Sequence, residues 1–461
     1  MKNGILDELQ ERANEKFALH EKHLNPKMVQ VLKTIGFDRH YVRGEGAYLF
    51  DREGQRYLDL LSGFGVFAVG RNHPTVKRAL ADVLSADMAD LIQMDVSPLA
   101  GLLAEQLLAR MPTQERVFFC NSGTEAVEAA IKLSRAATRR SKLIFCDHAF
   151  HGLTMGSLSL NGDATFREGF GQLLPDTVRI PWNDLPALER ALAGGDVAAF
   201  IVEPIQGKGV NLPAPGYLPE AQRLCRRAGT LFVTDEVQTG LGRTGRFLAG
   251  EYDNLDPDLV TLAKALSGGY VPVGAVAGKK WVFDKTFDRM DRAVVHGSTF
   301  AKNNLAMAAG LATLKVLDDE KLIENAARRG ESLIGRLREL VGRYELLADV
   351  RGRGMMIALE LGPPKSLKLR AAWALIDKAT KGLYCQMVVL PLFSRHRILS
   401  QVAGHDMYVI KLLPPLCLSE RDEDWIVRAV DDVMADCHRF PSAVWDLAAT
   451  FAGNTLKRHA G

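Results

Sequence analysis

The sequence predicts an α/β protein with a large, mostly parallel sheet that has helices on both faces, followed by a smaller α+β part. Short apolar runs of β-forming residues recur between residues 117 and 277, and helical stretches separate several of them. Two of these runs end on ionisable residues, as strands do where an open α/β sheet binds its ligand. The predicted strands are Val117–Cys120, Leu143–Cys146, Val197–Val202, Leu231–Thr234, Leu259–Leu262 and Val273–Ala277.

Length and composition describe a globular protein in more than one lobe. The chain has 461 residues, 47% hydrophobic and 25% charged, with a formal net charge of +3. Scattered basic residues do not favour nucleic acid as a partner, and the sequence predicts neither a membrane span nor a signal core. Six widely spaced cysteines without a Cys-x-x-Cys pair predict reduced thiols in the cytoplasm.

The segment before the sheet has three predicted parts. Residues 1–35 are amphipathic and predict helices, and residues 41–59 alternate around the turn signal Asp51–Gly54, which predicts a β-hairpin. A glycine-rich loop at 61–74 carries Phe64 and Phe67 and is typical of a pocket wall, although a surface turn explains it too. Helices are expected at 75–87 and 98–110.

The sheet-forming region has its own predicted helices at Glu125–Ala137 and Pro219–Ala228. After residue 305 the chain turns mainly helical, with helices predicted at Leu305–Val316, Leu322–Tyr344, Leu367–Lys381 and Glu423–His438. Strands are expected at Val350–Leu361, at Tyr408–Leu416 and around Val388–Leu392, and residues 440–461 are expected to pack on another part of the assembly. We therefore predict a segment 1–60 that packs with the small domain, a large domain 61–325 and a small domain 326–461.

Asp235 and Lys264 are the residues around which the prediction is organised. Each follows a short apolar run, so both are expected at the carboxyl edge of the sheet, one βαβ step apart. A carboxylate that keeps a ring nitrogen protonated, beside an amine that forms an imine, is what pyridoxal phosphate chemistry needs. Taken singly, Asp235 is explained as well by a strand-end turn and Lys264 by a solvated helix cap.

A second candidate site is the turn Asn121-Ser122-Gly123-Thr124-Glu125 between a strand and a helix. Ser122 and Glu125 fit a capping box, and Gly123 lets the backbone approach a ligand closely. Free amide groups and the Thr124 hydroxyl would then meet an anion at the positive end of the helix dipole. An ordinary helix start is the alternative.

Three further motifs follow predicted strands or lie in polar loops. Phe150 could stack on a flat ring, although a lone Phe is most often a core residue. Glu203 ends a strand and could instead brace the loop that Pro204 stiffens. Ser298 and Thr299 could bind a phosphate or act as helix caps.

Together these motifs resemble the class III aminotransferases. The ordered set is Asn121-Ser-Gly-Thr-Glu-Ala, Phe150-His-Gly, Glu203-Pro-Ile-Gln-Gly, Thr234-Asp-Glu-Val-Gln-Thr-Gly-Leu-Gly-Arg-Thr-Gly, Ala263-Lys-Ala-Leu-Ser-Gly-Gly and Gly297-Ser-Thr-Phe. The resemblance covers roughly residues 40–435. It implies fold type I and pyridoxal 5′-phosphate as cofactor, as in ornithine, acetylornithine, 4-aminobutyrate and putrescine aminotransferases.

The resemblance also implies residue roles. Lys264 would bind the cofactor covalently and carry a proton between Cα of the substrate and C4′ of the cofactor, while Asp235 would pair with the ring nitrogen. Gln238 would contact the ring hydroxyl. Phe150 would stack on the ring, and Glu203 would lie in the cofactor site. Ser122, Gly123 and Thr124 would hold the phosphate together with Thr299 of the second subunit, so a homodimer is implied.

Two positions depart from the family pattern. Many members have Glu after Glu-Pro-Ile-Gln-Gly and Arg before x-x-Pro-Pro-Leu, and in those proteins the Glu covers the Arg until a 2-oxo acid or glutamate enters. Here the positions are Lys208 and Lys411. Two lysines cannot pair, and lysine lacks the bidentate fork that recognises a carboxylate. Either Lys411 is a simpler anchor or another group, such as Arg353, takes its place.

The predicted function is transfer of an amino group between an amine or ω-amino acid and a 2-oxo acid. Apolar residues in regions that line the family's substrate channel favour a bulky or apolar substrate, although core packing explains most of them; they are Phe64, Val66, Phe67, Leu91, Ile92 and Met94. Another fold-type-I activity, such as an aminomutase or decarboxylase, is the first alternative. A non-catalytic homologue that binds the cofactor is the second.

Overall fold

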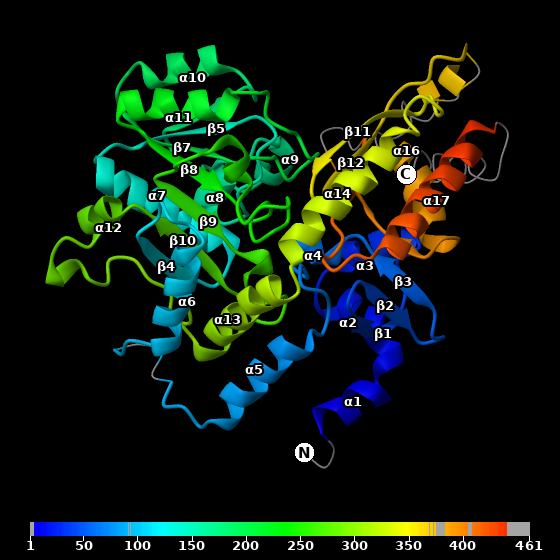
Figure 1. Cartoon of the computed structure of the whole chain (residues 1–461), viewed down its shortest axis with the longest axis horizontal. Coiled ribbons are helices and arrows are strands. Elements are labelled where there is room, and N and C mark those ends of the chain that lie inside the picture. Colours follow the sequence, from blue (N-terminus) through cyan, green and yellow to red (C-terminus); the bar gives the residue numbers. More distant parts are fainter. Residues whose placement is uncertain are drawn as a thin grey trace.

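The computed structural model describes residues 4–439 except 91, 93, 368, 372, 375–382 and 404–407. Figure 1 shows a large sheet with helices on both sides, and beside it a smaller sheet that lies near the N-terminal strands. The predicted helix Leu367–Lys381 falls largely outside the described residues, and so does the predicted packing of residues 440–461.

The large sheet has seven strands in the order β4-β10-β9-β8-β7-β5-β6. Only β10 runs antiparallel to its neighbours, and the other pairs are parallel. The strands are β4 (Arg116–Cys120), β5 (Lys142–Cys146), β6 (Thr177–Ile180), β7 (Val197–Val202), β8 (Leu231–Asp235), β9 (Leu259–Leu262) and β10 (Gly274–Gly278). All six predicted strands form. β6 was not predicted, because its alternating Thr-Val-Arg-Ile sequence lies at the sheet edge, where one face stays polar.

Helices cover both faces of this sheet, which is why its central strands are apolar on both sides. On one face α7 (Gly123–Thr138) and α12 (Lys280–Thr286) pack against side chains such as Ile201 and Val233. On the other face α10 (Leu185–Leu192) and α11 (Tyr217–Ala228) pack against Phe200 and Phe232. Successive strand residues thus enter two different cores, as the strand period of two requires.

A third set of helices surrounds the antiparallel side of the sheet. It comprises α5 (Pro74–Ser85), α6 (Pro98–Ala109) and α13 (Asn304–Asp319), which share one core with β9 and β10. Shorter elements between the strands are α4 (Ser62–Gly65), α8 (Met155–Ser159), α9 (Ala164–Arg167) and the 3-10 helices η2 (Ala249–Asp253), η3 (Lys264–Ser267) and η4 (Met290–Arg292).

The smaller sheet has the order β11-β12-β15-β14 and packs against helices. Its strands are β11 (Leu347–Arg353), β12 (Met356–Leu361), β14 (Gln401–Ala403) and β15 (Val409–Leu412), and its helices are α14 (Leu322–Arg338), α16 (Leu383–Ser394) and α17 (Glu420–His438). The single strand predicted at 350–361 is wrong. Gly354, at φ +53°, turns the chain back and makes an antiparallel hairpin of β11 and β12.

The strand predicted around Val388–Leu392 is also wrong, because these residues belong to helix α16. The sequence Leu-Tyr-Cys-Gln-Met-Val-Val-Leu-Pro-Leu-Phe is apolar nearly all round, so it carries no helical periodicity and its β-branched pair favoured a strand. In the fold α16 is buried between α17, the small sheet and β13, and this environment accepts an apolar side chain in every direction.

The N-terminal segment forms helices and then strands, as predicted. It contains α1 (Ile5–Glu11), η1 (Ala13–Glu15), α2 (Lys16–His23), α3 (Pro26–Thr34), β1 (Tyr41–Glu45), β2 (Tyr48–Asp51) and β3 (Arg56–Asp59). The turn after Asp51 joins β2 to β3, while a further turn at Gly46 makes the hairpin a three-stranded meander. β13 (Ile398–Leu399) pairs with β3 in parallel. The boundaries at 60/61 and 325/326 stay a prediction.

Candidate active site

The ends of β8 and β9 bring Asp235 and Lys264 to the same edge of the large sheet. The two strands are parallel neighbours, and Asp235 lies opposite Thr261 in the strand register. Lys264 follows β9 after one residue and starts the short helix η3. Its φ of 44° is left-handed, a strained conformation for a residue with a side chain and one that clusters at functional sites.

Three groups fix the buried carboxylate of Asp235. His151 Nδ1 lies 2.7 Å from Oδ2, while the Thr261 hydroxyl and the Val237 amide donate to Oδ1 at 3.0 and 3.1 Å. Burial acts to lower the pKa of His151, but the Asp235 carboxylate outweighs it, so the pKa is raised. The other ring nitrogen of His151, Nε2, is buried and has no partner within the described part of the chain.

Lys264 offers an amine of lowered basicity next to this carboxylate. Burial lowers the pKa of Lys264, although Asp235 and Glu203 act in the opposite direction. Its Nζ makes no hydrogen bond to any residue that the structure describes. A desolvated amine beside a fixed carboxylate can act as a nucleophile and as a base.

Glu203, at the end of β7, braces two loops. Its Oε2 accepts from the Phe150 amide at 3.0 Å, and its Oε1 accepts from the Gly207 amide at 2.7 Å. Burial raises the pKa of Glu203. These contacts agree with the alternative raised from the sequence, in which Glu203 braces a loop.

The N-terminus of α7 carries a cluster of hydroxyl groups. Thr124 Oγ1 lies 2.7 Å from Thr154 Oγ1 and 2.6 Å from Ser157 Oγ. Gly152 leaves room for this cluster, since a Cβ at that position would lie 2.5 Å from Thr124 Oγ1. Loops after two different strand ends thus meet at the positive end of a 16-residue helix, where backbone and dipole favour an anion.

The predicted capping box exists in a modified form. Ser122 Oγ accepts from the Glu125 amide at 3.2 Å, but the Glu125 carboxylate accepts from the amide of Asn121, at 2.7 Å, rather than from that of Ser122. The Asn121 side chain donates to Ser298 Oγ at 2.6 Å, which places the loop before α13 beside this turn in the same chain. The neighbouring Thr299 is exposed.

The two aromatic side chains predicted for the site, Phe150 and Phe67, have different neighbours. Phe150 is half-buried and meets Phe166 edge to face, with the ring centroids 5.4 Å apart. Phe67 lies under the Arg71 guanidinium at 3.9 Å and packs on the loop after Lys264. That loop needs glycine, because a Cβ at Gly269 would lie 2.4 Å from the Phe67 ring. Phe67 is therefore in direct contact with the lysine loop.

The two lysines that depart from the family pattern have different partners. Lys208 forms an ion pair with Asp163 and lies 5.2 Å from the centroid of the Phe166 ring. Lys411, on β15, is only 5% exposed and donates to Gly207 O at 2.8 Å and to Gln238 Oε1 at 3.2 Å. The alternative carboxylate anchor, Arg353, stacks on Tyr252 with its guanidinium carbon 4.6 Å from the ring centroid.

The predicted apolar wall has a mixed outcome. Val66, Phe67 and Ile92 are half-buried, whereas Phe64 and Met94 are exposed and Leu91 lies outside the described residues. Sequence reasoning missed His151, Thr154 and Ser157 as site residues. A signal for His151 existed, since it follows β5 at the same sheet edge as Asp235.

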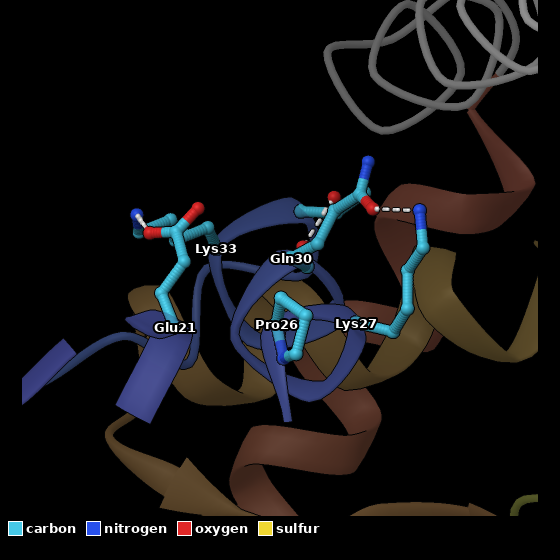
Figure 2. A pocket seen from close by; sticks show the side chains of 6 residues that line it. Glu21, Pro26, Lys27, Gln30 and Lys33 are labelled. Atoms are coloured by element: carbon cyan, nitrogen blue, oxygen red, sulfur yellow. Dashed lines mark hydrogen bonds and ion pairs between the residues drawn. The ribbon is translucent and has the colours of Figure 1, made fainter. Parts of the chain in front are cut away.

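A surface depression elsewhere has no part in this site. Figure 2 shows it on α2 and α3, lined by Glu21, Pro26, Lys27, Gln30, Lys33 and Thr34. Its charged groups are exposed and partly paired, for example Lys33 with Glu21 at 3.2 Å. The residues described contain no group of three or more His, Cys, Asp or Glu side chains that could hold a metal ion.

The chemistry of the donor set fits pyridoxal phosphate. The hydroxyl cluster at the α7 N-terminus can hold the phosphate, and the glycine at position 152 keeps that cradle open. Asp235 can hold the ring nitrogen, because His151 and Thr261 already fix its carboxylate. The amine of Lys264 is available for covalent attachment.

The comparisons with known proteins agree on one family. Residues 32–434 match the family described as Aminotransferase class-III. Aminotransferase PigE from Serratia sp. (strain ATCC 39006) is 34% identical to this chain over 454 residues. The match covers 91% of this chain but only 53% of PigE, so the chain spans about half the length of that relative.

Solved structures agree over most of both chains. The ornithine aminotransferase from Toxoplasma gondii ME49 has a TM-score of 0.78 and 31% identity, with 90% of this chain and 96% of that chain covered. An amine transaminase from an uncultivated Pseudomonas species, in its pyridoxal-phosphate-bound form, has a TM-score of 0.75 and 30% identity, with 87% and 95% covered. The chain belongs to the class III aminotransferases, a family of fold-type-I enzymes that depend on pyridoxal phosphate.

Proposed function

We propose that the chain is a transaminase that moves an amino group between an amine or ω-amino acid and a 2-oxo acid. The observation that carries the proposal is the meeting of Lys264, with its desolvated amine, and the fixed carboxylate of Asp235 at one sheet edge. Family membership and the hydroxyl cluster at the α7 N-terminus support it.

The side chains divide the work in a simple way. Pyridoxal phosphate, when bound, supplies an electron-withdrawing ring for the carbon that loses its proton. Asp235 keeps the ring nitrogen protonated, and the hydrogen bonds from His151 and Thr261 hold its carboxylate in place. Once the cofactor and the substrate are bound, the amine of Lys264 would act as the base that moves the proton of the substrate Cα.

We infer that this site lacks the gated carboxylate switch of many relatives. Lys208 is engaged by Asp163, and Lys411 is engaged by a main-chain carbonyl and an amide oxygen, so neither covers or frees the other. Neither lysine presents the planar fork that grips a carboxylate at two points. We therefore expect amines without an α-carboxylate to be better donors than α-amino acids such as glutamate.

A donor and acceptor panel tests this function. Adding an amine donor alone to the holoenzyme should convert the cofactor to its amino form, with loss of the visible absorbance, and adding a 2-oxo acid should restore it. Amines without an α-carboxylate should react faster than glutamate. An absorbance that no donor changes would contradict the transaminase assignment, and glutamate as the best donor would contradict the substrate class.

Kinetics of Lys411→Ala separate the two explanations for carboxylate binding. If Lys411 anchors a carboxylate, KM for 2-oxo acids and glutamate should rise while KM for simple amines stays constant. Unchanged use of glutamate would show that Lys411 is not the anchor.

We also propose a homodimer with shared sites. Exposed apolar side chains gather near the segments before α6 and before α13, namely Met94, Val96, Leu102, Met290, Val294 and Phe300, and Thr299 is in the second segment. Mixing Lys264→Ala and Thr299→Ala subunits tests the sharing. In a hybrid dimer, one of the two sites would combine intact Lys264 with intact Thr299, so about half of the activity per dimer should return. No recovery would exclude this arrangement.

We further propose a cytoplasmic location. The six cysteines are free thiols, five of them buried and Cys417 partly so, as expected in a reducing compartment. Titration of the denatured protein isolated under non-reducing conditions should find six thiols, and fewer would contradict the proposal. Among the described residues no helix is long and apolar enough to cross a membrane.

A further inference from the structure

The amide of Gln238 is held at both ends by groups of opposite polarity. Its Oε1 accepts from Lys411 Nζ at 3.2 Å, and its Nε2 donates to the carbonyl of Phe64 at 3.1 Å. The Phe64 carbonyl can only accept, and Lys411 Nζ is placed to donate to Oε1 as it does to the Gly207 carbonyl, so these partners favour one orientation of the amide. Turning the amide over would set oxygen against oxygen at Phe64.

The surroundings are built around this orientation. A Cβ at Gly207 would lie 2.7 Å from Gln238 Oε1, so the glycine leaves the space that the amide oxygen occupies. The Gly207 carbonyl takes a second hydrogen bond from Lys411 at 2.8 Å. The Phe64 carbonyl is presented by a left-handed turn in which Ser62, Gly63 and Phe64 all have positive φ. Three distant segments thus converge on one amide.

Lys411 is poorly placed to serve as a carboxylate anchor. Two of its three N–H donors are already used by protein acceptors, and the side chain is buried. Burial, and then the charge of Lys264, lower the pKa of Lys411 to about 7, while Glu203 acts to raise it and Arg243 to lower it further. Near neutral pH the amine therefore carries only part of a charge, which weakens attraction for an anion but not its ability to donate.

We propose that Lys411 is a positioning residue for the cofactor, because it fixes the Gln238 amide so that N–H donors, rather than the oxygen, are offered to the hydroxyl of the pyridine ring. This inference rests on the proposed binding of pyridoxal phosphate at Lys264. Nε2 has two N–H groups, of which the Phe64 carbonyl uses one. The second is available to an ionised ring oxygen, which accepts hydrogen bonds only.

A double-mutant cycle on the holoenzyme tests the role. Lys411→Met, Gln238→Ala and the double variant are compared by the pH midpoint of the visible absorbance and by the rate of cofactor loss during dialysis. Lys411→Met should raise the midpoint, because a ring oxygen without its donor attracts the proton on the Lys264 nitrogen more strongly. Cofactor loss should become about tenfold faster, equivalent to about 1.4 kcal/mol.

The cycle also separates this role from a direct effect of the Lys411 charge on Lys264. If Lys411 acts through Gln238, the double variant should behave like Gln238→Ala alone. If the charge acts directly, Lys411→Met should raise the midpoint by the same amount in both backgrounds, which would overturn the proposal. An unchanged midpoint together with a raised KM for 2-oxo acids would overturn it as well.

Two further variants guard against a trivial result. Lys411→Arg keeps a donor and a charge, so it should stay close to the wild-type midpoint even if Lys411→Met fails to fold. Lys279→Met removes a half-buried lysine that donates to the Thr113 carbonyl at 2.7 Å, at the opposite edge of the sheet, and should leave both readouts unchanged. A wild-type protein that binds the cofactor but transaminates nothing would refute the proposed function alone. One that binds no cofactor would refute both.

Discussion

The cofactor side and the substrate side of the site are built in different ways. On the cofactor side, Asp235 ends one strand and Lys264 follows its parallel neighbour, and the register of the large sheet fixes their places. On the substrate side, Lys208 lies in a loop, and an ion pair with Asp163, the N-cap residue of α9, holds its side chain.

This difference bears on how the chemistry and the specificity of such a protein can change separately. Strand register is set by an entire buried sheet, so a single substitution does not move Asp235 relative to Lys264. A loop contact such as Lys208 with Asp163 rests on one ion pair and one aromatic neighbour. Substitutions on the substrate side can therefore alter recognition while the cofactor side stays intact.

Replacement of Lys264 is expected to have the largest effect. Lys264→Ala removes the proton carrier, and a rate loss of about 10⁴-fold is expected, at the upper end of general acid–base contributions. The half-reaction with an amine donor, followed by absorbance, measures it. Lys279→Ala at the opposite sheet edge is the control. A Lys264→Ala enzyme that keeps more than a tenth of the rate would remove the basis of the comparison.

Asp235→Asn should come next. Without the carboxylate the ring nitrogen loses its charge partner, and His151 loses the group that raises its pKa. We expect kcat/KM to fall about 10³-fold, or about 4 kcal/mol. Asp258→Asn is a matched control, since Asp258 accepts from the Phe232 amide at the other end of the same strands. Equal losses in the two variants would show that the effect is structural.

Thr124→Val tests the phosphate end of the cofactor side. It removes the hydroxyl that joins Thr154 and Ser157 at the α7 N-terminus. Affinity for pyridoxal phosphate should fall by about tenfold, which corresponds to one to two neutral hydrogen bonds. Thr138→Val, at the other end of the same helix, removes a hydroxyl that donates to the Ser134 carbonyl and accepts from the Arg140 amide, and should not change the affinity.

The smallest effect is expected for the ion pair of Asp163 with Lys208, as a change of folding stability with pH. Burial acts to raise the pKa of Asp163, but the Lys208 hydrogen bond and the Thr165 amide outweigh it and lower the pKa to about 2, from an ordinary value of 3.8. The pair therefore adds stability above pH 3.8, and the gain disappears as pH falls through 2.

Free energies of unfolding over this pH range check the pair. Asp163→Asn should cost roughly 1 kcal/mol at neutral pH, and its difference from wild type should vanish between about pH 4 and pH 2. Lys208→Met should show the same loss at neutral pH and the same disappearance in acid. A difference that persists at low pH would assign the stabilisation to something other than this ion pair.

The positions of Asp235 and Lys264 at one sheet edge could be predicted from sequence, because each stands at the end of an apolar run. The capping residues of α7 were predicted for the same reason, although the Glu125 carboxylate turns to Asn121. The sequence did not identify His151, Thr154 and Ser157 as site residues, because their partners Asp235 and Thr124 are distant in sequence. A short polar motif does not specify which side chains a loop turns inward.

The two wrong predictions of secondary structure have a related cause, which is that they too depend on neighbours distant in sequence. Helix α16 was predicted as a strand, since an apolar run without periodicity fits either element until its neighbours are known. The hairpin of β11 and β12 was predicted as one strand, because the sequence around Gly354 does not show that this glycine has a positive φ and forms a turn. Both errors lie in the part of the chain that forms the smaller sheet and its helices, where the burial of a segment is set by neighbours such as α14 and α17.

The amino-acid sequence by itself determined the α/β class, six of the seven strands of the large sheet and the placing of Asp235 and Lys264 at one sheet edge, because apolar periodicity and parallel strand order act locally and repeatedly along the chain. The tertiary structure alone decided what Lys208 and Lys411 contact, since those partners come from segments that only folding brings together. The physical reason is that a strand end is specified by its own run of residues, whereas a side-chain contact across elements is specified by the packing of all of them.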